Sequence, residues 1–419
     1  MPQVRLVLGN DLYPPFEVPE NCDLGTWKEM IETGSWGGDK VMYCRKLTCR
    51  NEMGQHLDNM SSVPEEMHVD GPRSIYAMLE IALKKKLGSP KCLREPVQRV
   101  REKECRRDGW PFLGDYHVGV QIGRGFDGPC VYEAKHVGSG EKVAVKWPAK
   151  AEEVAVLKSV AERLPPDCPG IPRLLASGRF KEIPYLVMDQ YRQPLTEVYP
   201  RLWWMPLEKR WPAVRALGRM LVRRLEALHN CGFVHCDISP ENILLSRRDN
   251  PLCMPVLIDF GLARRYPGGG PLLGEFGSNE WSSIRAALGG ERRPEDDLEA
   301  LGWVMLNAVF QHLPWCHFLE KAYAQWHLEA TRNLTVQQVA WTKRRLLDEG
   351  WDVFGECCLS QTPNELYRFL HSSRHEVTPP QRPDYEYLII LLGGKARSDT
   401  TWQQADEEDR LEWENYYKP

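Results

Sequence analysis

The chain has 419 residues, of which 42% are hydrophobic and 27% charged, and its formal net charge is -4. This composition is ordinary for a globular protein, and it excludes a global basic surface, so no direct nucleic-acid binding is indicated. We expect neither a signal peptide nor membrane insertion, because no apolar run approaches the ~18 residues of a membrane helix. The thirteen cysteines form no regular framework, which favours a cytoplasmic or nuclear location where thiols stay reduced.

Residues 1–110 differ in pattern from the rest and are predicted to be an N-terminal extension of unknown role. Their one clear helical pattern covers residues 74–87, where an apolar face predicts docking on the next domain or on a partner. The charge-dense stretch 94–107 is predicted to be a linker or an exposed helix. A loose zinc-ligand pattern is also present, but no second cysteine pair follows it: Cys44, Cys49, His56 and His68.

Residues 111–419 are predicted to form a two-lobe α+β domain. In the small lobe, about 112–190, we expect five strands and one helix. The strands are placed at 117–122, 131–136, 142–147, 173–177 and 185–189, and the helix at 151–163. The larger lobe, about 191–419, is predicted to be mostly helical with short strands near 243–245 and 256–258. A cleft between the lobes would be the ligand site.

Two patterns in the small lobe indicate phosphate binding. A loop between the first two strands is rich in glycine, which lets backbone N–H groups approach phosphate oxygens. A dinucleotide fold would need a helix directly after this loop, whereas a strand-like segment follows. On the third strand, Lys146 is spaced to hold phosphate oxygens, with Glu153 predicted as its carboxylate partner and Glu152 as the alternative. The loop glycines are Gly123, Gly125 and Gly128.

The strongest pattern is His-Cys-Asp-Ile-Ser-Pro-Glu-Asn at 235–242, followed by Ile-Asp-Phe-Gly at 258–261. Phosphoryl transfer depends mainly on positioning and charge neutralisation. Asp237 can orient a substrate hydroxyl and accept its proton. Asn242 and Asp259 can hold Mg²⁺, a cation that prefers oxygen ligands. ATP and Mg²⁺ are therefore the predicted cofactors.

From about Tyr116 the chain resembles the eukaryotic protein kinases, and more narrowly the casein kinase type I and vaccinia-related kinase group. Three segments carry the narrower resemblance: Gly-Ser-Asn-Glu-Trp-Ser-Ser-Ile at 277–284, Asp-Asp-Leu-Glu-Ala-Leu-Gly-Trp at 296–303 with Leu-Pro-Trp at 313–315, and Arg-Pro-Asp-Tyr-Glu-Tyr-Leu at 382–388. The resemblance implies a bilobal protein-kinase fold and a Ser/Thr kinase that acts on protein substrates. The compact, divergent core would suit a viral enzyme.

The same resemblance predicts the nucleotide pocket. Adenine is expected to pack between Val131 and Ala144 above and Leu244 below. Met188 is expected at the back of the pocket. Backbone groups from Asp189 to Tyr191 are expected to bond the base, because this segment joins the lobes.

Several positions depart from the family pattern. Cys236 replaces an Arg that pairs with a phosphorylated activation loop, which predicts activity without loop phosphorylation. Ser239 replaces a Lys that contacts the γ-phosphate, and it is expected to face that phosphate without supplying charge. One extra residue lies in the glycine loop, before Val131. Arg292 and Arg293 lie two positions further from the 296–303 helix than the family's basic pair, so they either contact an acidic or phosphorylated substrate or form a solvated pair.

Three functions remain open at this stage. The first is an active Ser/Thr protein kinase. The second is a weak or inactive pseudokinase scaffold, favoured by Cys236 and Ser239. The third is a small-molecule phosphotransferase, which shares the His-x-Asp-x-x-x-x-Asn pattern but is disfavoured by the Asp-Phe-Gly motif.

Overall fold

The computed structural model divides the chain into two compact units, residues 1–110 and 111–419. Each unit is described by itself. The residues that the structure describes are 3–8, 11–12, 16–17, 22–33, 48–51, 56–57, 66–70, 91–92, 112–124, 130–164, 168, 170–180, 183–245, 255–268, 280–311, 313–316, 318–319, 329–351, 358–374 and 382–416.

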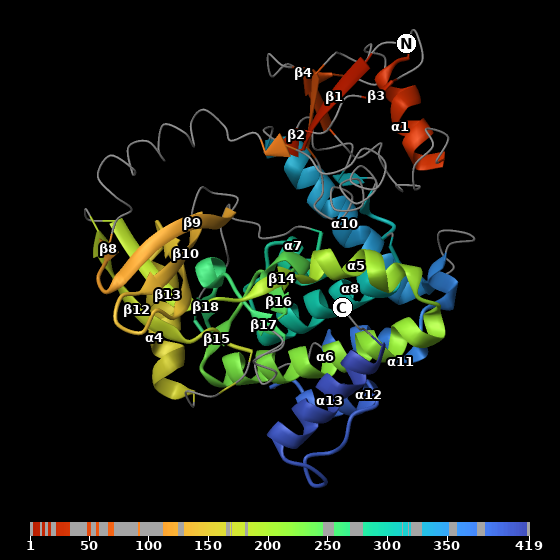
Figure 1. The fold of residues 1–419 in the computed structure, drawn as a ribbon. Coiled ribbons are helices and arrows are strands. Elements are labelled where there is room, and N and C mark those ends of the chain that lie inside the picture. Colours follow the sequence, from red (N-terminus) through yellow and green to blue (C-terminus); the bar gives the residue numbers. More distant parts are fainter. Residues whose placement is uncertain are drawn as a thin grey trace. The chain divides into compact units, whose positions relative to one another are not determined.

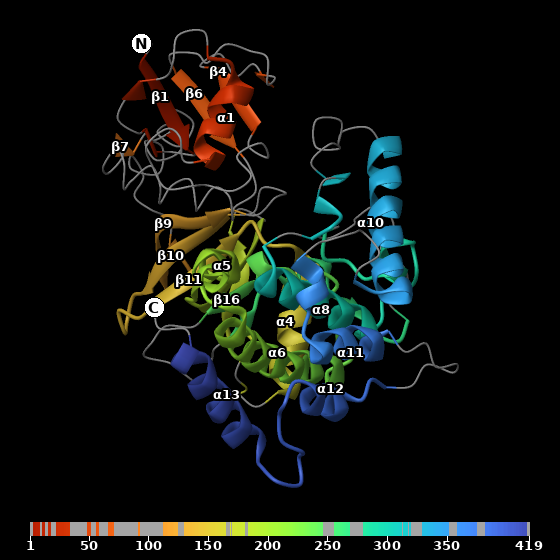
Figure 2. The same cartoon turned by 90° about the vertical axis from the view of Figure 1, so that its right-hand side faces the viewer.

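The described residues of the first unit include a mixed sheet and a helix (Figure 2). Its strands run in the order β5-β4-β6-β1-β2-β7, with β3 paired to β1, and β1 and β6 are parallel. Helix α1 (Leu24–Thr33) buries Leu24 and Trp27, and the Asp23 carboxylate accepts a bond of 2.7 Å from the Thr26 N–H at its start. The strands are β1 (Gln3–Leu8), β2 (Asp11–Leu12), β3 (Phe16–Glu17), β4 (Thr48–Asn51), β5 (His56–Leu57), β6 (Glu66–Asp70) and β7 (Lys91–Cys92).

Neither this sheet nor α1 was expected from the sequence. The helix predicted at 74–87 and the linker at 94–107 lie outside the described residues, as does Cys44 of the zinc pattern. The backbone register places His56 and His68 opposite Arg50, not opposite Cys49.

The second unit begins with an antiparallel sheet in the order β12-β13-β11-β10-β9-β8. The sheet has six strands, so the prediction of five was wrong: it missed β8, which has only two residues. Of the six predicted elements, five lie where the sequence indicated, and β12 is shifted toward 180. The elements are β8 (Phe112–Leu113), β9 (Tyr116–Arg124), β10 (Cys130–His136), β11 (Lys142–Trp147), α4 (Ala151–Arg163), β12 (Leu174–Phe180) and β13 (Ile183–Asp189).

The rest of this unit is mainly helical, as predicted (Figure 1). The helices are α5 (Leu195–Trp204), α6 (Leu207–Asn230), α7 (Ile284–Ala287), α8 (Pro294–Val309), α10 (Glu329–Glu349), α11 (Asn364–Ser373), α12 (Tyr385–Leu391) and α13 (Trp402–Tyr416). Short 3₁₀ turns cover Pro240–Asn242, Phe260–Leu262 and Cys358–Gln361. The strands are β14 (Arg192–Pro194), β15 (Phe233–Val234), β16 (Ile243–Leu245), β17 (Val256–Leu257) and β18 (Arg264–Arg265).

Helix α8 forms the centre of the helical lobe. Pro294 occupies its first turn, where the missing N–H costs nothing, and the Asp296 carboxylate accepts the Arg293 N–H at 2.7 Å. From Asp296 to its end, every residue of α8 is buried. Helix α6 packs beside it and is joined to α13 by buried ion pairs of Arg219 and Arg223 with Asp409. The start of α8 lies beside residues 235–236, whose backbone N–H groups donate to Asp297.

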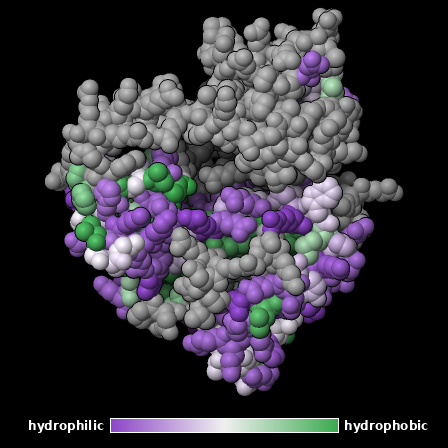
Figure 3. Space-filling model, viewed as in Figure 1, coloured by the Kyte–Doolittle hydropathy of each residue, from purple (hydrophilic) through white to green (hydrophobic). Residues whose placement is uncertain are grey.

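No helix in the described part of the chain combines the length and apolar character needed to cross a membrane. On the face drawn in Figure 3, the described surface is mainly hydrophilic and its apolar residues form small separate groups.

Candidate active site

Lys146 joins the two lobes through two carboxylates. It is 5% exposed on β11 and donates to Glu153 Oε1 at 2.8 Å and to Asp259 Oδ1 at 2.9 Å. Burial alone would lower its pKa, but the charges of Glu153 and Asp259 outweigh burial and raise it. Glu152 is exposed, so the structure brings Glu153, and not the alternative, to Lys146. A permanently charged lysine is thereby held where the phosphate-binding pattern predicted it.

Asp259 has the geometry of a candidate metal ligand. Its backbone is left-handed (φ 65°), and its Oδ1 accepts both Lys146 Nζ and, at 3.2 Å, the Gly261 N–H. Burial would raise its pKa, but the charge and hydrogen bond of Lys146 more than offset this effect and lower it. The carboxylate therefore stays ionised, and Oδ2 is the oxygen left to bind a cation.

The catalytic loop presents Asp237 and Asn242 together. The Asn242 amide nitrogen donates to the Asp237 backbone carbonyl and to its Oδ2, both at 2.9 Å. Because the nitrogen is committed, the amide oxygen of Asn242 remains as a hard ligand. Together with Asp259, it gives the donor set that Mg²⁺ prefers.

The backbone before Asp237 is held by Asp297, at the start of α8. Asp297 accepts the His235 N–H at 2.7 Å, the Cys236 N–H at 2.9 Å and His229 Nε2 at 2.9 Å. His229 Nδ1 in turn lies 2.7 Å from the hydroxyl of Tyr385. Burial would raise the pKa of Asp297, but the bonds from His229 and from the loop reverse this effect and lower it.

Sequence reasoning did not assign these three anchoring residues to the site. The signal was present, because Asp297 and Tyr385 lie in two of the segments that carried the narrower resemblance.

The predicted adenine-binding residues lie along one part of the sheet and the segment after it. Ala144 is buried and pairs with Met188 across β11 and β13. Val131 is half-buried against the core, and Leu244 lies in β16. Their contact with a nucleotide stays a prediction.

Two side chains bind Asp189 in the segment between the lobes. Arg173 binds its carboxylate through Nε at 2.9 Å and Nη2 at 2.8 Å, and the Tyr191 hydroxyl donates to it at 3.2 Å. Side chains therefore hold the Asp189 carboxylate, and the bonding of the base by backbone groups of this segment stays a prediction. Of the loop glycines, Gly123 lies near the end of β9 and pairs with Val131 of β10, whereas Gly125 and Gly128 lie outside the described residues.

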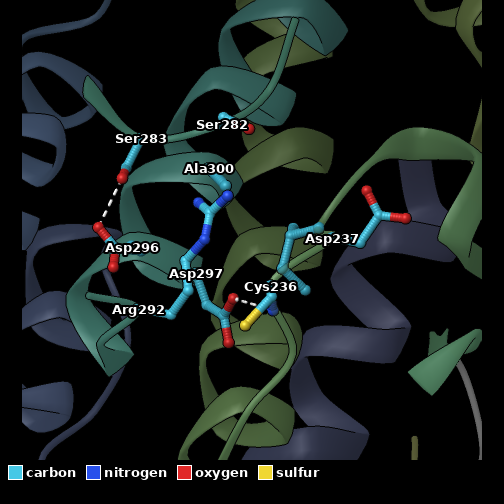
Figure 4. A pocket seen from close by; sticks show the side chains of 9 residues that line it. Cys236, Asp237, Ser282, Ser283, Arg292, Asp296, Asp297 and Ala300 are labelled. Carbon is cyan, nitrogen blue, oxygen red and sulfur yellow. Dashed lines mark hydrogen bonds between the residues drawn. The ribbon is translucent and has the colours of Figure 1, made fainter. Parts of the chain in front are cut away.

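A small pocket lies beside the catalytic loop, between Cys236–Ile238, Ser282–Ser283 and the start of α8. Figure 4 shows the Arg292 side chain reaching into it, while the Asp237 carboxylate points away. Arg292 is 5% exposed and Arg293 is half-buried. A solvated pair is therefore wrong for Arg292, because packing against the start of α8 buries its side chain.

Ser239 is 1% exposed, and its hydroxyl has no hydrogen-bond partner among the described residues. The predicted contact with a γ-phosphate is untested by this geometry. A buried hydroxyl adds no charge to the site, so a cation must come from elsewhere.

These residues, in this order and on these elements, define a protein kinase. A model of the protein kinase domain matches residues 116–377, more than half of the chain, and the chain belongs to that family.

Relatives identify the type of kinase. A probable casein kinase I homolog of Encephalitozoon cuniculi is 27% identical over 291 residues, which cover 66% of this chain and 84% of that protein. Casein kinase I homolog 1 of Schizosaccharomyces pombe is 26% identical over 315 residues, 71% of this chain and 64% of that protein. A probable serine/threonine-protein kinase of Dictyostelium discoideum is 27% identical over 224 residues, 50% of this chain and 43% of that protein. The predicted casein kinase I type and the serine/threonine kinase class are confirmed.

Proposed function

We propose that this kinase is active and transfers the γ-phosphoryl group of ATP to serine or threonine hydroxyls of proteins. One observation carries the proposal: Lys146 binds Glu153 and Asp259 at the same time. This contact joins a strand of the small lobe to the metal-binding motif of the large one, as phosphoryl transfer requires.

The residues have separate roles in the proposed reaction. Lys146 would hold phosphate oxygens, and Asn242 and Asp259 would hold Mg²⁺, which would neutralise charge on the phosphates. Asp237 orients the substrate hydroxyl. As the bond from the hydroxyl oxygen to the γ-phosphorus forms, the bond from that phosphorus to the β–γ bridging oxygen breaks. The hydroxyl proton passes to Asp237, and ADP leaves.

The test is phosphate transfer by the purified full chain, with labelled ATP, Mg²⁺ and a mixed protein substrate. Asp237→Asn is the control, because asparagine keeps the size of the side chain but cannot take the proton. We expect transfer by the unmodified protein and a loss of at least ~10²-fold in the variant, the scale of general-base catalysis. Equal transfer by both proteins would contradict the role of Asp237.

A pseudokinase scaffold is the second candidate, favoured by the uncharged, buried Ser239 and by Cys236. Mg²⁺-dependent ATP binding without any phosphate transfer would identify it. For either candidate we propose a reducing compartment, cytoplasmic or nuclear, because most of the cysteines whose side chains are described are buried in the fold.

A further inference from the structure

The connection between Lys146 and α4 is very short. Only Trp147, Pro148 and Ala149 separate Lys146 from Lys150, the residue that caps the start of α4. Glu153, the partner of Lys146, is therefore in the first turn of α4. As a consequence the beginning of this helix, and not its middle, lies beside Asp259.

This arrangement brings the Lys150 side chain to Gly261, the glycine two residues after Asp259. A Cβ atom built on Gly261 would lie 3.6 Å from Lys150 Cδ, 3.1 Å from Asp259 Oδ1 and 4.0 Å from Glu153 Oε2. These three side chains thus converge on one point. The ammonium group of Lys150 lies only one methylene beyond Cδ, so it can reach the same edge of the site as the Asp259 carboxylate.

The charges at the site favour a second lysine near the terminal phosphate. Lys146 is already bound to two carboxylates, Glu153 and Asp259. Asp237 adds a third carboxylate, which accepts a bond from Asn242. A nucleotide triphosphate adds further negative charge. Ser239, at the position where the family pattern has a lysine, is uncharged and buried.

We propose that Lys150 is a second phosphate-binding lysine, which binds oxygens of the terminal phosphate of ATP and supplies the positive charge that Ser239 lacks. This inference rests on the proposed binding of Mg-ATP. The short connection after β11 places Lys150 at this position, because a longer connection would move the start of α4 away from Gly261.

The test compares the affinities of Mg-ATP and Mg-ADP by calorimetry on the full chain. In Lys150→Met, we expect Mg-ATP affinity to fall by ~10- to 100-fold, the scale of one hydrogen bond to a charged group. Mg-ADP lacks the terminal phosphate, so its affinity should change by less than about threefold on the same scale. Lys158→Met is the matched control, because Lys158 is an exposed lysine of the same helix, and both of its affinities should stay unchanged.

A second variant separates charge from side-chain packing. Lys150→Gln keeps most of the length and polarity of the side chain without its charge, and should show the same selective loss for Mg-ATP. In the Lys150→Met background, Ser239→Lys should restore part of the preference for ATP over ADP, since it returns a cation to the same phosphate.

The outcomes distinguish this inference from the proposed function. If the unmodified protein bound no Mg-ATP, both would be overturned. If it bound Mg-ATP and both Lys150 variants kept its preference over Mg-ADP, only the role of Lys150 would be wrong. An equal loss of affinity for Mg-ATP and Mg-ADP would show that Lys150 maintains the shape of the pocket and does not bind the terminal phosphate. That result would also overturn the proposal.

Discussion

Replacing Asp297 with asparagine should loosen the catalytic loop and destabilise the fold. The Asp297 carboxylate accepts three bonds while fully buried: Oδ2 takes His235 N–H and His229 Nε2, and Oδ1 takes Cys236 N–H. An asparagine has one acceptor oxygen, so its NH₂ group would face one of these donors. The variant keeps the size of the side chain and removes only its charge and one acceptor.

The expected magnitude follows from these bonds. A buried donor left without an acceptor costs about 1–3 kcal/mol, and loss of a charged hydrogen bond costs about 1.5–3 kcal/mol. We expect the free energy of unfolding to fall by about 3–5 kcal/mol, the range for breaking a buried pair. Because His235 and Cys236 lead directly into Asp237, kcat should fall by ~10²-fold, as it does when reacting groups are displaced by about 1 Å.

The assay is urea denaturation of the full chain followed by tryptophan fluorescence, with kcat measured in parallel. The folded-state pKa of Asp297 is lowered, so its contribution is present above the unfolded pKa and is lost as pH falls. The difference between the two proteins should therefore shrink below about pH 4.

Asp384→Asn is the matched control for this experiment. Asp384 is an exposed helix cap that accepts the Tyr387 N–H at 2.9 Å, and asparagine caps about as well as aspartate. A difference of less than about 0.5 kcal/mol between Asp297→Asn and the unmodified protein, within the range of ordinary surface substitutions, would refute the reasoning.

Three further predictions concern metal binding, phosphorylation and pH. Asp259→Asn should abolish Mg²⁺-dependent turnover at saturating Mg²⁺ with the fold intact by circular dichroism, because a neutral amide lacks the anionic oxygen; unchanged catalysis would contradict it. Tyr266 is the only Ser, Thr or Tyr between 261 and 277, and neither Tyr266→Phe nor phosphatase treatment should change the rate of phosphate transfer. A rate that falls on phosphatase treatment and returns when Tyr266 is rephosphorylated would overturn this claim. Burial lowers the pKa of Lys343 to about 7, although the charge of Glu299 acts in the opposite direction. Because the unfolded chain keeps this proton up to about pH 10, the free energy of unfolding should rise between about pH 7 and 10. Urea midpoints of Lys343→Met should lack this rise.

Much of the small lobe could be predicted because its signals are local. The segment Lys142–Trp147 is a short run with two β-branched valines, and Ala151–Arg163 repeats apolar residues at helical spacing. β8 was missed because two residues show no period. In the first unit, α1 did carry a signal: Asp23 precedes it and Gly34 follows it, the residue types that commonly begin and end helices. Turn residues around it obscured that pattern.

The contiguous motifs predicted the reacting groups, but not the residues that hold them. Asp237 and Asn242 are five positions apart and could be assigned together. Asp297 binds His229 across 68 positions, and His229 meets Tyr385 across 156. No periodicity links residues at such separations. These contacts depend on how α6, α8 and α12 pack, which a single sequence does not specify locally.

The anchoring by Asp297 also explains why Cys236 can stand where the family pattern has an arginine. Asp297 binds the backbone N–H groups of His235 and Cys236, and not their side chains. Cys236 adopts a left-handed backbone (φ 68°), an unfavourable conformation that persists only when its surroundings enforce it. These two backbone bonds supply that constraint whatever the side chain at 236. Losing the arginine therefore removes a contact for a loop phosphate, while the position of Asp237 is kept.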